Sequence, residues 1–435
     1  MTHVLLAPAA RQFTSTAGSE SGWIFDIVTG LIELDPELHF TCVAETVDPK
    51  TYERMEQYAI GSRRSDEVGG AMLPFRIARA TRQLGILDRV DLIHHGLPFG
   101  LNRTYSILAL QAARRQLPFV VGPIQSPLSF RGSDEMSGRL ETQRQTLARV
   151  SSRAIANISS PAVMTMFGRL SSATLRSALR VVTIDANTKE SIIALGVLPE
   201  RVLVIPPPLR SFSPQPIVGG ALGNTVRVMT AGYLIERKST RDVVLSVARL
   251  AADGNPIGLD VLGDGPELSA LRQLAGEIPG GESIHFHGWL DRDGLSRVIR
   301  SAHVYVSMSR SESWGQAVVE AMSAGLVTIS ADNDGARKLA AIGAPIHLVG
   351  IGAVSELEAV LLEMCGQRPA SLRGVGAAGI SWVKTNLSVP VISQCWRDVY
   401  KQAIDESAQI RSSHKNNRLV SKTQFVSKET NEKKQ

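Results

Sequence analysis

The feature that most constrains the fold is a repeated alternation of short apolar runs with helical patterns along the 435-residue chain. This alternation is typical of parallel α/β sheets, in which a helix connects one strand to the next. In the first half we expect strands at His3–Pro8, Phe40–Ala44, Val90–Ile93, Phe119–Val121 and Val181–Ile184. In the second half we expect them at VRVMTAG, GLDVLGDG, IHFHGW, HVYVSMS, LVTIS and PIHLV. Helical segments between these are Arg241–Asp253, Glu267–Leu274, Leu290–Arg300 and Gln316–Ala324.

A segment rich in proline and glycine, Ile205 to Thr225, interrupts the alternation and is typical of a linker. A chain of this length exceeds one compact core, so we expect two domains. The expected parts are an N-terminal domain at 1–210, a linker at 211–225, a C-terminal domain at 226–385, a closing helix at 386–410 and a disordered basic tail at 411–435. In such sheets ligands bind beyond the carboxyl ends of the strands.

Cysteine usage and hydropathy restrict the class of protein. No run approaches the roughly 18 apolar residues that a membrane-spanning helix needs. The start, MTHVLLAPAARQF, has no basic leader and is expected to be a buried strand rather than a signal peptide. The three cysteines are far apart and form no CxxC pair, which argues against a disulfide framework or a zinc site. We therefore expect a cytoplasmic protein.

Positive charge is concentrated in two segments. Residues 136–180 contain seven arginines and one glutamate, and residues 411–435 contain seven basic and two acidic side chains. The Arg-rich segment 136–180 could contact anionic lipid headgroups on the cytoplasmic face of a membrane, or hold an acidic substrate. The alternative is a set of solvated helix faces. Nucleic acid is not an expected partner, because aromatic residues are only 5% and no stacking platform is visible.

One stretch in the second half, SESWGQAVVEAMSAG (Ser311–Gly325), combines groups that could bind a sugar and a phosphate. Glu312 follows a strand, Gly315 permits close approach of the backbone to a ligand, and Glu320 lies one to two turns into the next helix. The two carboxylates can accept hydrogen bonds from hydroxyls, and the N–H groups of Trp314–Ala317 can meet an anion. The alternative is that Glu312 caps the helix and Glu320 is a solvated helix residue.

This stretch resembles the glutamate-seven-glutamate signature of family 4 glycosyltransferases, which are retaining enzymes of the GT-B fold. VLGDGPEL (Val261–Leu268) resembles the family's G-x-G-P-E element, and IHFHGWL (Ile284–Leu290) resembles its strand ending in a glycine beside the nucleotide base. AGYLIERKS (Ala231–Ser239) resembles its G-R-L-x-x-x-K element. DANTKESIIALGV and RVLVIPPPL match the segment before the linker. The resemblance implies two Rossmann-like domains facing across a cleft, with C-terminal helices packing back toward the N-terminal domain.

The resemblance also implies roles for individual residues. Glu312 would contact hydroxyls of the donor sugar, and Glu320 would accept hydrogen bonds from the ribose. Trp314 and Gly315 would offer backbone N–H groups to sugar or phosphate. Lys238 would neutralise the diphosphate, where negative charge develops as the sugar–phosphate bond breaks.

The remaining donor-binding candidates are the glycines of the other elements, Gly263, Gly265 and Gly288. The family's arginine after the glycine is Tyr233 here, which can donate a hydrogen bond but carries no positive charge. Arg237 is the candidate substitute, and the alternative is that it is a solvated residue at a helix start.

No metal or other cofactor is expected. A D-x-D pair that could bind a metal-diphosphate does not follow any expected strand, and the nearest candidate is Asp332-Asn333-Asp334. We expect these residues to form a turn before a helix from Ala336. A metal-independent reaction is also what the resemblance implies.

Two segments of the N-terminal half are candidates for the acceptor side of a site. RVDLIHHGLPFG ends a strand with His94 and His95, and with LPFVVGPIQSP it resembles a histidine-bearing strand end of the family. Neighbouring residues on a strand point in opposite directions, so which histidine faces the cleft stays open, and the alternative is that both are satisfied in a loop. In TAGSESGWIFDIV, Gly18 and Gly22 resemble the family's glycine loop, whereas a simple helix cap by a neighbouring serine is the alternative.

Together these observations predict a retaining hexosyltransferase that moves a sugar from a nucleotide diphosphate sugar to an acceptor hydroxyl. We expect it to act in cell-surface polysaccharide, glycolipid or glycoconjugate biosynthesis, on a carbohydrate or lipid-linked acceptor. A UDP-sugar is preferred to a GDP-sugar as donor. The alternatives are a nucleotide-sugar epimerase of the same fold and a non-catalytic nucleotide-sugar-binding protein or partner subunit, to which Tyr233 points.

Overall fold

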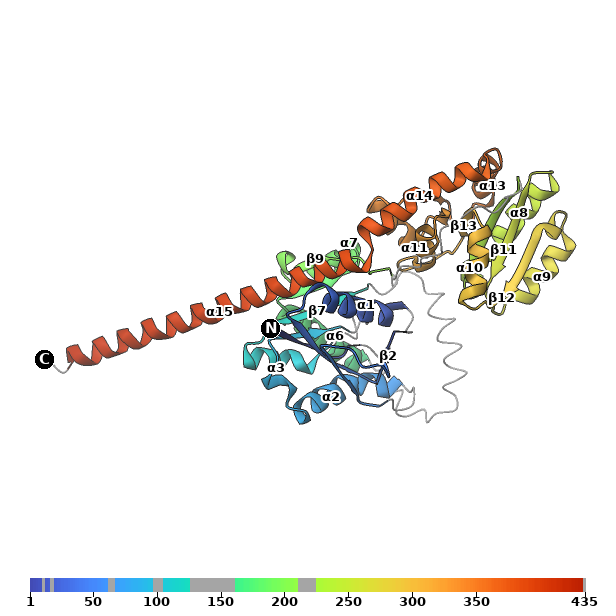
Figure 1. Cartoon of the computed structure of the whole chain (residues 1–435). Helices are drawn as coiled ribbons and strands as arrows, with labels where there is room; N and C mark the ends of the chain where they lie inside the picture. Colours follow the sequence, from blue (N-terminus) through green and yellow to red (C-terminus); the bar gives the residue numbers. More distant parts are fainter. Residues whose placement is uncertain are drawn as a thin grey trace. The chain divides into compact units, whose positions relative to one another are not determined.

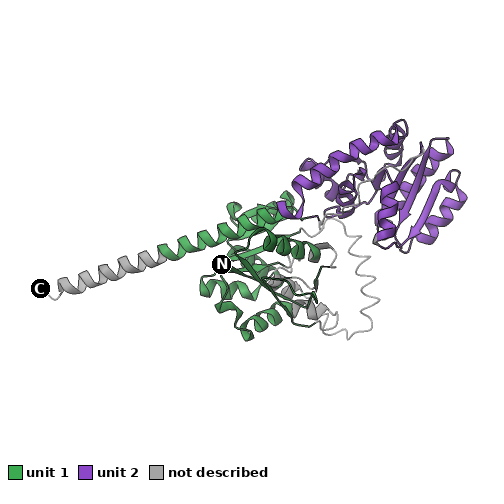
Figure 2. Ribbon diagram, viewed as in Figure 1, with its two compact units in different colours: residues 1–208, 392–435 green, residues 209–391 purple. Residues whose placement is uncertain are grey.

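The computed structural model of the chain describes residues 1–9, 12–15, 19–61, 67–96, 105–125, 161–209 and 224–432 (Figure 1). The chain divides into two compact units, one of residues 1–208 with 392–435 and one of residues 209–391 (Figure 2). Most of the expected linker at 211–225 lies outside the described residues.

The first unit is built on a parallel seven-stranded sheet of order β5-β3-β1-β6-β7-β8-β9. Its strands are β1 (Thr2–Leu6), β3 (Leu38–Ala44), β5 (Met55–Ala59), β6 (Leu92–His95), β7 (Phe119–Ile124), β8 (Arg180–Thr183) and β9 (Val202–Val204). A separate pair is formed by β2 (Gln12–Phe13) and β4 (Thr46–Val47). The five strands expected in the first half are all present, with ends shifted by a few residues.

Helices connect several of these strands along the chain. They are α1 (Ser19–Leu34), α2 (Glu67–Gln83), α3 (Ile107–Arg115), α6 (Pro161–Ser177) and α7 (Ala186–Ala194), with short 3-10 turns at Ile86–Asp88 and Pro199–Arg201. The start of α7 shows how sequence sets a boundary: the Asp185 carboxylate accepts the Thr188 N–H at 2.8 Å and caps the helix.

The second unit is built on a parallel six-stranded sheet of order β12-β11-β10-β13-β14-β15. Its strands are β10 (Val226–Ala231), β11 (Ile257–Leu262), β12 (Ile284–Gly288), β13 (Val304–Ser307), β14 (Val327–Ala331) and β15 (Ile346–Val349). These are the six strands that the apolar runs predict.

The helices of the second unit include the four expected between strands and the one expected from Ala336, which begins at Asp334, and two more follow toward the C-terminus. They are α8 (Thr240–Ala252), α9 (Leu268–Glu277), α10 (Arg292–Ser301), α11 (Gln316–Ser323), α12 (Asp334–Ala341), α13 (Val354–Cys365) and α14 (Pro369–Asn386). Two 3-10 turns, η4 (Glu236–Lys238) and η5 (Gly281–Ser283), complete the unit. All six residues of β11 are buried, as expected for a strand covered on both faces of a parallel sheet.

The last helix, α15 (Val389–Glu432), belongs to the first unit, as the expected packing of the C-terminal helix requires. Trp396 and Tyr400, four residues apart, are fully buried in that unit's core. The Glu406 carboxylate accepts a hydrogen bond from Arg180 at 2.5 Å and fixes the helix further along. No helix in the described parts of the chain is long and apolar enough to cross a membrane.

The extent of α15 differs from the expectation for residues 411–435. The helix continues to Glu432, whereas composition predicts a tail without regular structure from residue 411. A physical reason is that residues 405–432 contain neither glycine nor proline, the residues that most strongly end a helix.

Candidate functional site

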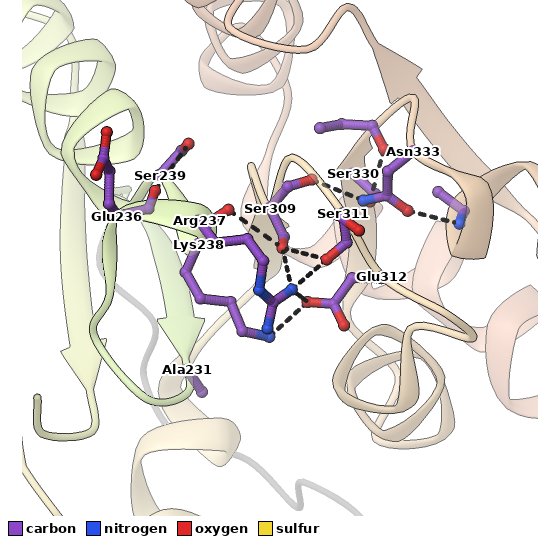
Figure 3. A network of polar contacts seen from close by, with 12 residues as sticks. Ala231, Glu236, Arg237, Lys238, Ser239, Ser309, Ser311, Glu312, Ser330 and Asn333 are labelled. Atoms are coloured by element: carbon purple, nitrogen blue, oxygen red, sulfur yellow. Dashed lines mark hydrogen bonds and ion pairs between the residues drawn. The ribbon is translucent and has the colours of Figure 1, made fainter. Parts of the chain in front are cut away.

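The candidate donor site lies in the second unit, where the loops after β10, β13 and β14 meet at the carboxyl edge of the sheet (Figure 3). η4 at the end of the first loop carries Arg237 and Lys238, and the second loop carries Glu312. Ligands of parallel α/β sheets bind at this edge, because the strands end there and the next helices begin.

Glu312 forms an ion pair with two cations from the neighbouring loop. The Lys238 ammonium donates to its Oε1 at 2.5 Å, and the Arg237 guanidinium lies 3.4 Å from the same atom. Burial opposes ionisation of Glu312, whose side chain is 19% exposed, but the charge and hydrogen bond of Lys238 outweigh it and lower the pKa. Glu312 is therefore an anion at neutral pH.

Arg237 connects the loop after β10 to the loop after β13. Its guanidinium donates to the Ser311 carbonyl and, at 3.3 Å, to the Ser309 hydroxyl, and its own carbonyl accepts the Arg310 N–H at 2.9 Å (Figure 3). The side chain is only 28% exposed. The alternative of a solvated residue at a helix start does not describe it.

The start of α12 also holds the loop after β13 in place, through a contact that the sequence did not predict. The Asn333 amide donates to the Ser309 carbonyl at 2.7 Å and accepts the Ala336 N–H at 3.0 Å (Figure 3). A Cβ added at Gly335 would lie 2.9 Å from the Trp314 carbonyl carbon. The sequence indicates the cap, since asparagine favours this position, but not the bond to the next loop.

Glu320 lies on α11, which begins after Gly315 in a left-handed conformation with φ of 83°. The side chain of Glu320 reaches solvent and accepts a hydrogen bond from Gln316 at 3.3 Å. Its pKa is raised, because surrounding protein removes part of the hydration of the carboxylate.

Tyr305 on β13 is a buried phenol whose pKa is affected by both glutamates. Burial raises the pKa of its phenol, and the negative charges of Glu312 and Glu320 raise it further. The hydroxyl donates to the Ala231 carbonyl at the end of β10, at 3.4 Å. Both carboxylates therefore act electrostatically on one buried phenol.

The glycines expected to bind the donor lie in tightly packed loops. A Cβ at Gly263 would lie 1.9 Å from the Gly232 carbonyl oxygen, and one at Gly265 would lie 2.4 Å from the Leu234 carbonyl oxygen. At Gly288, φ is 67° and no other atom lies within 4 Å of the Cβ position. The first two glycines are thus required for close approach of two loops, which the sequence alone could not show.

Two aromatic candidates differ in exposure. The Trp314 side chain is buried, so only its backbone can face a ligand. Tyr233 is 59% exposed and projects from the loop that also carries Lys238.

The paired histidines end β6 in the first unit, and both are buried. The His94 ring bonds the Tyr400 hydroxyl at 2.7 Å and the Gly122 carbonyl at 2.8 Å, so it is a structural residue joining β6, β7 and α15. Neither ring nitrogen of His95 has a hydrogen-bond partner among the described residues. Burial lowers the pKa of His94 to about 4, and burial together with His94 lowers that of His95 to about 3.

Other expected residues are less informative. Gly18 lies outside the described residues, as do the arginines between 126 and 160. Arg169 and Arg176 are exposed on α6, whereas Arg180 is occupied by Glu406. In the part of the chain that the structure describes, no group of three or more His, Cys, Asp or Glu side chains could hold a metal ion.

Comparison with known families agrees with the placement of this site. Residues 220–355 match the family described as "Glycosyl transferases group 1". The gpi3 subunit of phosphatidylinositol N-acetylglucosaminyltransferase from Schizosaccharomyces pombe is 26% identical over 158 residues, which are 36% of this chain and 35% of that protein. Phosphatidyl-myo-inositol mannosyltransferase from Mycolicibacterium smegmatis is 29% identical over 154 residues, 35% of this chain and 39% of that protein. The matched region thus spans between about a third and a half of the length of the curated relatives.

Solved structures extend the similarity to almost the whole chain. Anabaena Alr3699/HepE in complex with UDP has a TM-score of 0.61 at 13% identity and covers 92% of this chain and 100% of its own. The lipopolysaccharide outer core galactosyltransferase WaaB has a TM-score of 0.58 at 14% identity, with 93% and 99% covered. The fold is therefore GT-B, with two Rossmann-like α/β units, as the resemblance implies.

Proposed function

We propose that the chain is a glycosyltransferase that moves a sugar from a nucleotide diphosphate sugar to an acceptor hydroxyl with retention of anomeric configuration and without a metal ion. The observation that carries the proposal is the pairing of Glu312 with Lys238 and Arg237 in the loops at the carboxyl edge of the sheet, within the residues that match the glycosyl transferase family. The carboxyl edge of this sheet thus offers a cation that can bind the diphosphate and carboxylates that can accept hydrogen bonds from sugar hydroxyls.

Each group has a role in binding the donor. Lys238 meets the diphosphate and stabilises the charge that develops there as the glycosidic bond breaks. Glu312 accepts hydrogen bonds from the transferred sugar, and Glu320 accepts them from the ribose. Charge-assisted hydrogen bonds of this kind contribute about 1.5–3 kcal/mol each. Trp314 and Gly315 supply backbone N–H groups.

Retention is part of the proposal because the resemblance to family 4 glycosyltransferases implies it. Glu312, the buried anion of the site, is held by Lys238 and surrounded by the loop after β13, which favours a hydrogen-bonding role over covalent attack on the sugar. The acceptor hydroxyl then attacks the face that the diphosphate leaves, and a leaving-group oxygen takes its proton. The fixed cations of the edge stabilise the separated charges in this step.

The first unit supplies the acceptor side. Two buried residues at the carboxyl ends of β6 and β7 lack hydrogen-bond partners among the described residues, at both ring nitrogens of His95 and at Oε1 of Gln125. With its lowered pKa, His95 is neutral and can donate from one nitrogen and accept at the other. A neutral set with donors and acceptors suits hydroxyl groups, and His95 is the better candidate of the two histidines for substrate contact.

The relatives suggest the biological class and the donor. Several act, by name, on phosphatidylinositol or lipopolysaccharide, and HepE was solved with UDP. We therefore propose a lipid-linked or carbohydrate acceptor in glycolipid or polysaccharide biosynthesis, and a UDP-sugar donor. A cytoplasmic location is proposed, with the Arg-rich segment 136–180 at an anionic membrane surface. Vesicle sedimentation with and without phosphatidylglycerol tests that last point, and no binding to either would contradict it.

The test of function starts with a thermal-shift panel of nucleoside diphosphates and continues with the sugar donors of the best one. Proton NMR then follows the anomeric signal of donor and product with a panel of glycolipid and saccharide acceptors. A product that keeps the donor's anomeric configuration, formed in EDTA, supports the proposal. A new sugar from donor alone indicates an epimerase. Tight nucleotide binding without turnover on any acceptor indicates a non-catalytic binding protein.

A further inference from the structure

The first unit has a helical face on which exposed apolar side chains lie among arginines, and the donor site does not use it. Three helices form this face, α2, α3 and α6, and α3 contacts both of the others (Figure 1). The Phe75 ring of α2 lies against Tyr105 at the start of α3, with ring centroids 6.4 Å apart. The Ser106 N–H at the cap of α3 donates to the Thr174 hydroxyl of α6 at 3.0 Å. The three helices are therefore one connected layer, whose outer side is called the α2-α3-α6 face below.

This layer covers one side of the sheet and α1 covers the other. The connections that contain α2, α3 and α6 run from β5 to β6, from β6 to β7 and from β7 to β8, all in one direction across the sheet. The connection that contains α1 runs from β1 to β3, in the opposite direction. Because crossovers between parallel strands are right-handed, the two directions place their helices on opposite faces.

The two sides of the unit differ in charge. The sequences of α2, α3 and α6 contain seven arginines and one acidic residue, Glu67, whereas α1 contains three acidic residues and no basic one. Arg76 and Arg115 form salt bridges with acidic residues outside the three helices. Within the described ranges of the chain, four exposed arginines of the layer form no salt bridge: Arg79, Arg82, Arg114 and Arg169. Most of this positive charge is thus open to an external partner.

Large apolar side chains project among these arginines. On α2, Phe75, Arg79 and Arg82 follow one another at helical spacing, and all three are exposed. On α3, the exposed Leu110 and Arg114 are four residues apart. A single exposed leucine needs no explanation. Apolar side chains beside arginines on three adjoining helices are typical of a surface that lies in a membrane interface, and the exposed fractions are 49% for Phe75, 65% for Leu110 and 41% for Leu170.

We propose that the α2-α3-α6 face docks on an anionic lipid bilayer, with its arginines at the headgroups and with Leu110 and Phe75 in the interface beneath them. A bilayer fits better than a protein, because α3 and α6 contain no acidic residue that could pair with the cations of a protein surface. A layer of anionic headgroups has one sign of charge, as this face has. Each arginine close to such a surface strengthens binding about fivefold.

Docking on this face gives the acceptor side of the first unit access to lipid. α3 follows β6, the strand that ends in His95, so this face adjoins the sheet edge proposed to bind the acceptor. The inference rests on the proposed function for its lipid-linked acceptor, whereas the donor site plays no part in the contact.

Sedimentation of the full chain with vesicles tests the proposal. The vesicles consist of phosphatidylcholine alone or of equal parts phosphatidylcholine and phosphatidylglycerol. Wild type should bind the second kind only, and more weakly as salt is added, because salt screens the headgroup charge. Arg79→Gln with Arg114→Gln should weaken binding about 5- to 30-fold. Leu110→Gln should also weaken it, about fivefold, although it removes no charge.

A matched control removes the same charge from the second unit. Arg272 and Arg297 are exposed on α9 and α10, and Arg272→Gln with Arg297→Gln should bind the vesicles as wild type does. Melting temperatures equal to that of wild type check that the variants are folded.

The outcomes separate this proposal from the function on which it rests. Wild type that does not sediment with the anionic vesicles overturns the proposal, and so does an equal loss of binding in the control variant. Unchanged binding by Arg79→Gln with Arg114→Gln would assign the contact to another surface and would overturn it as well. UDP titrated into the same proteins by calorimetry reports on the donor site, so absent UDP binding with intact vesicle binding would contradict the proposed function alone.

Discussion

Replacing Glu312 by glutamine should tighten the binding of a nucleoside diphosphate while it slows transfer. In the structure Glu312 neutralises Lys238 at 2.5 Å and partly neutralises Arg237 at 3.4 Å. A diphosphate that binds Lys238 must share that ammonium with Glu312 and tolerate its negative charge. Glutamine keeps the shape and one acceptor oxygen but carries no charge, so it removes both penalties.

The size of the effect follows from the geometry. A phosphate oxygen that contacts Lys238 lies about two hydrogen-bond lengths, roughly 5–6 Å, from the Glu312 carboxylate. At an effective dielectric constant of about 20, the repulsion of two unit charges at this separation is about 3 kcal/mol. Lys238 and Glu312 are 24% and 19% exposed, so solvent screening reduces this value to about 1–2 kcal/mol. UDP should therefore bind about 5- to 30-fold more tightly.

Isothermal titration of UDP into wild type, Glu312→Gln and Glu320→Gln measures this difference. Glu320→Gln is the matched control, because Glu320 bonds Gln316 and pairs with neither Lys238 nor Arg237 in the structure. Its loss removes an acceptor for hydroxyls without freeing a cation, so affinity should fall. Transfer should be slower in both variants. Unchanged or weaker UDP binding by a folded Glu312→Gln would refute the proposed competition for Lys238.

Four further predictions concern residues of the two candidate sites and their neighbours. Gly335→Ala should slow transfer and lower the melting temperature, since its Cβ would lie 2.9 Å from the carbonyl carbon of Trp314; activity equal to wild type would contradict this support role. His94→Ala should lower the free energy of unfolding in urea by about 2–4 kcal/mol, because it leaves two buried partners unsatisfied. His95→Ala should instead reduce turnover about tenfold more than His94→Ala does. Equal turnover of the two variants would contradict the proposal that His95 contacts the substrate. Protonation of Glu320 should weaken UDP binding as the pH is lowered, and because its pKa is raised this loss should begin at a higher pH than it would for an ordinary glutamate. The affinity of Glu320→Gln should not show this loss.

The strands of the second unit could be predicted from the sequence because burial leaves a simple pattern. A strand covered on both faces is a short apolar run, and all six runs of residues 226–349 became strands. β5 was missed because Met55–Ala59 is half polar and lies at the edge of its sheet. The end of α15 was missed because polar composition indicates disorder but does not prevent a helix when glycine and proline are absent.

Side-chain partners could not be predicted, because they depend on contacts between loops that are distant in sequence. The alternation of side chains along a strand left open which of His94 and His95 faces the cleft. Both are buried, since each face of β6 is covered, and only their hydrogen-bond partners distinguish them. The partner of His94 is Tyr400, 306 residues away, and no local pattern indicates that bond.

The same contacts bear on the position of Tyr233, where the family 4 glycosyltransferases that this stretch resembles have an arginine. Arg237 lies in the same loop, but its guanidinium is engaged by the Ser311 carbonyl and the Ser309 hydroxyl, so its charge is fixed beside Glu312. In the proposed function, Lys238 is then the cation that the diphosphate shares with Glu312. Arg237 stays paired with Glu312 and offsets part of its negative charge while the donor is bound. Tyr233, which carries no charge, could not supply that role.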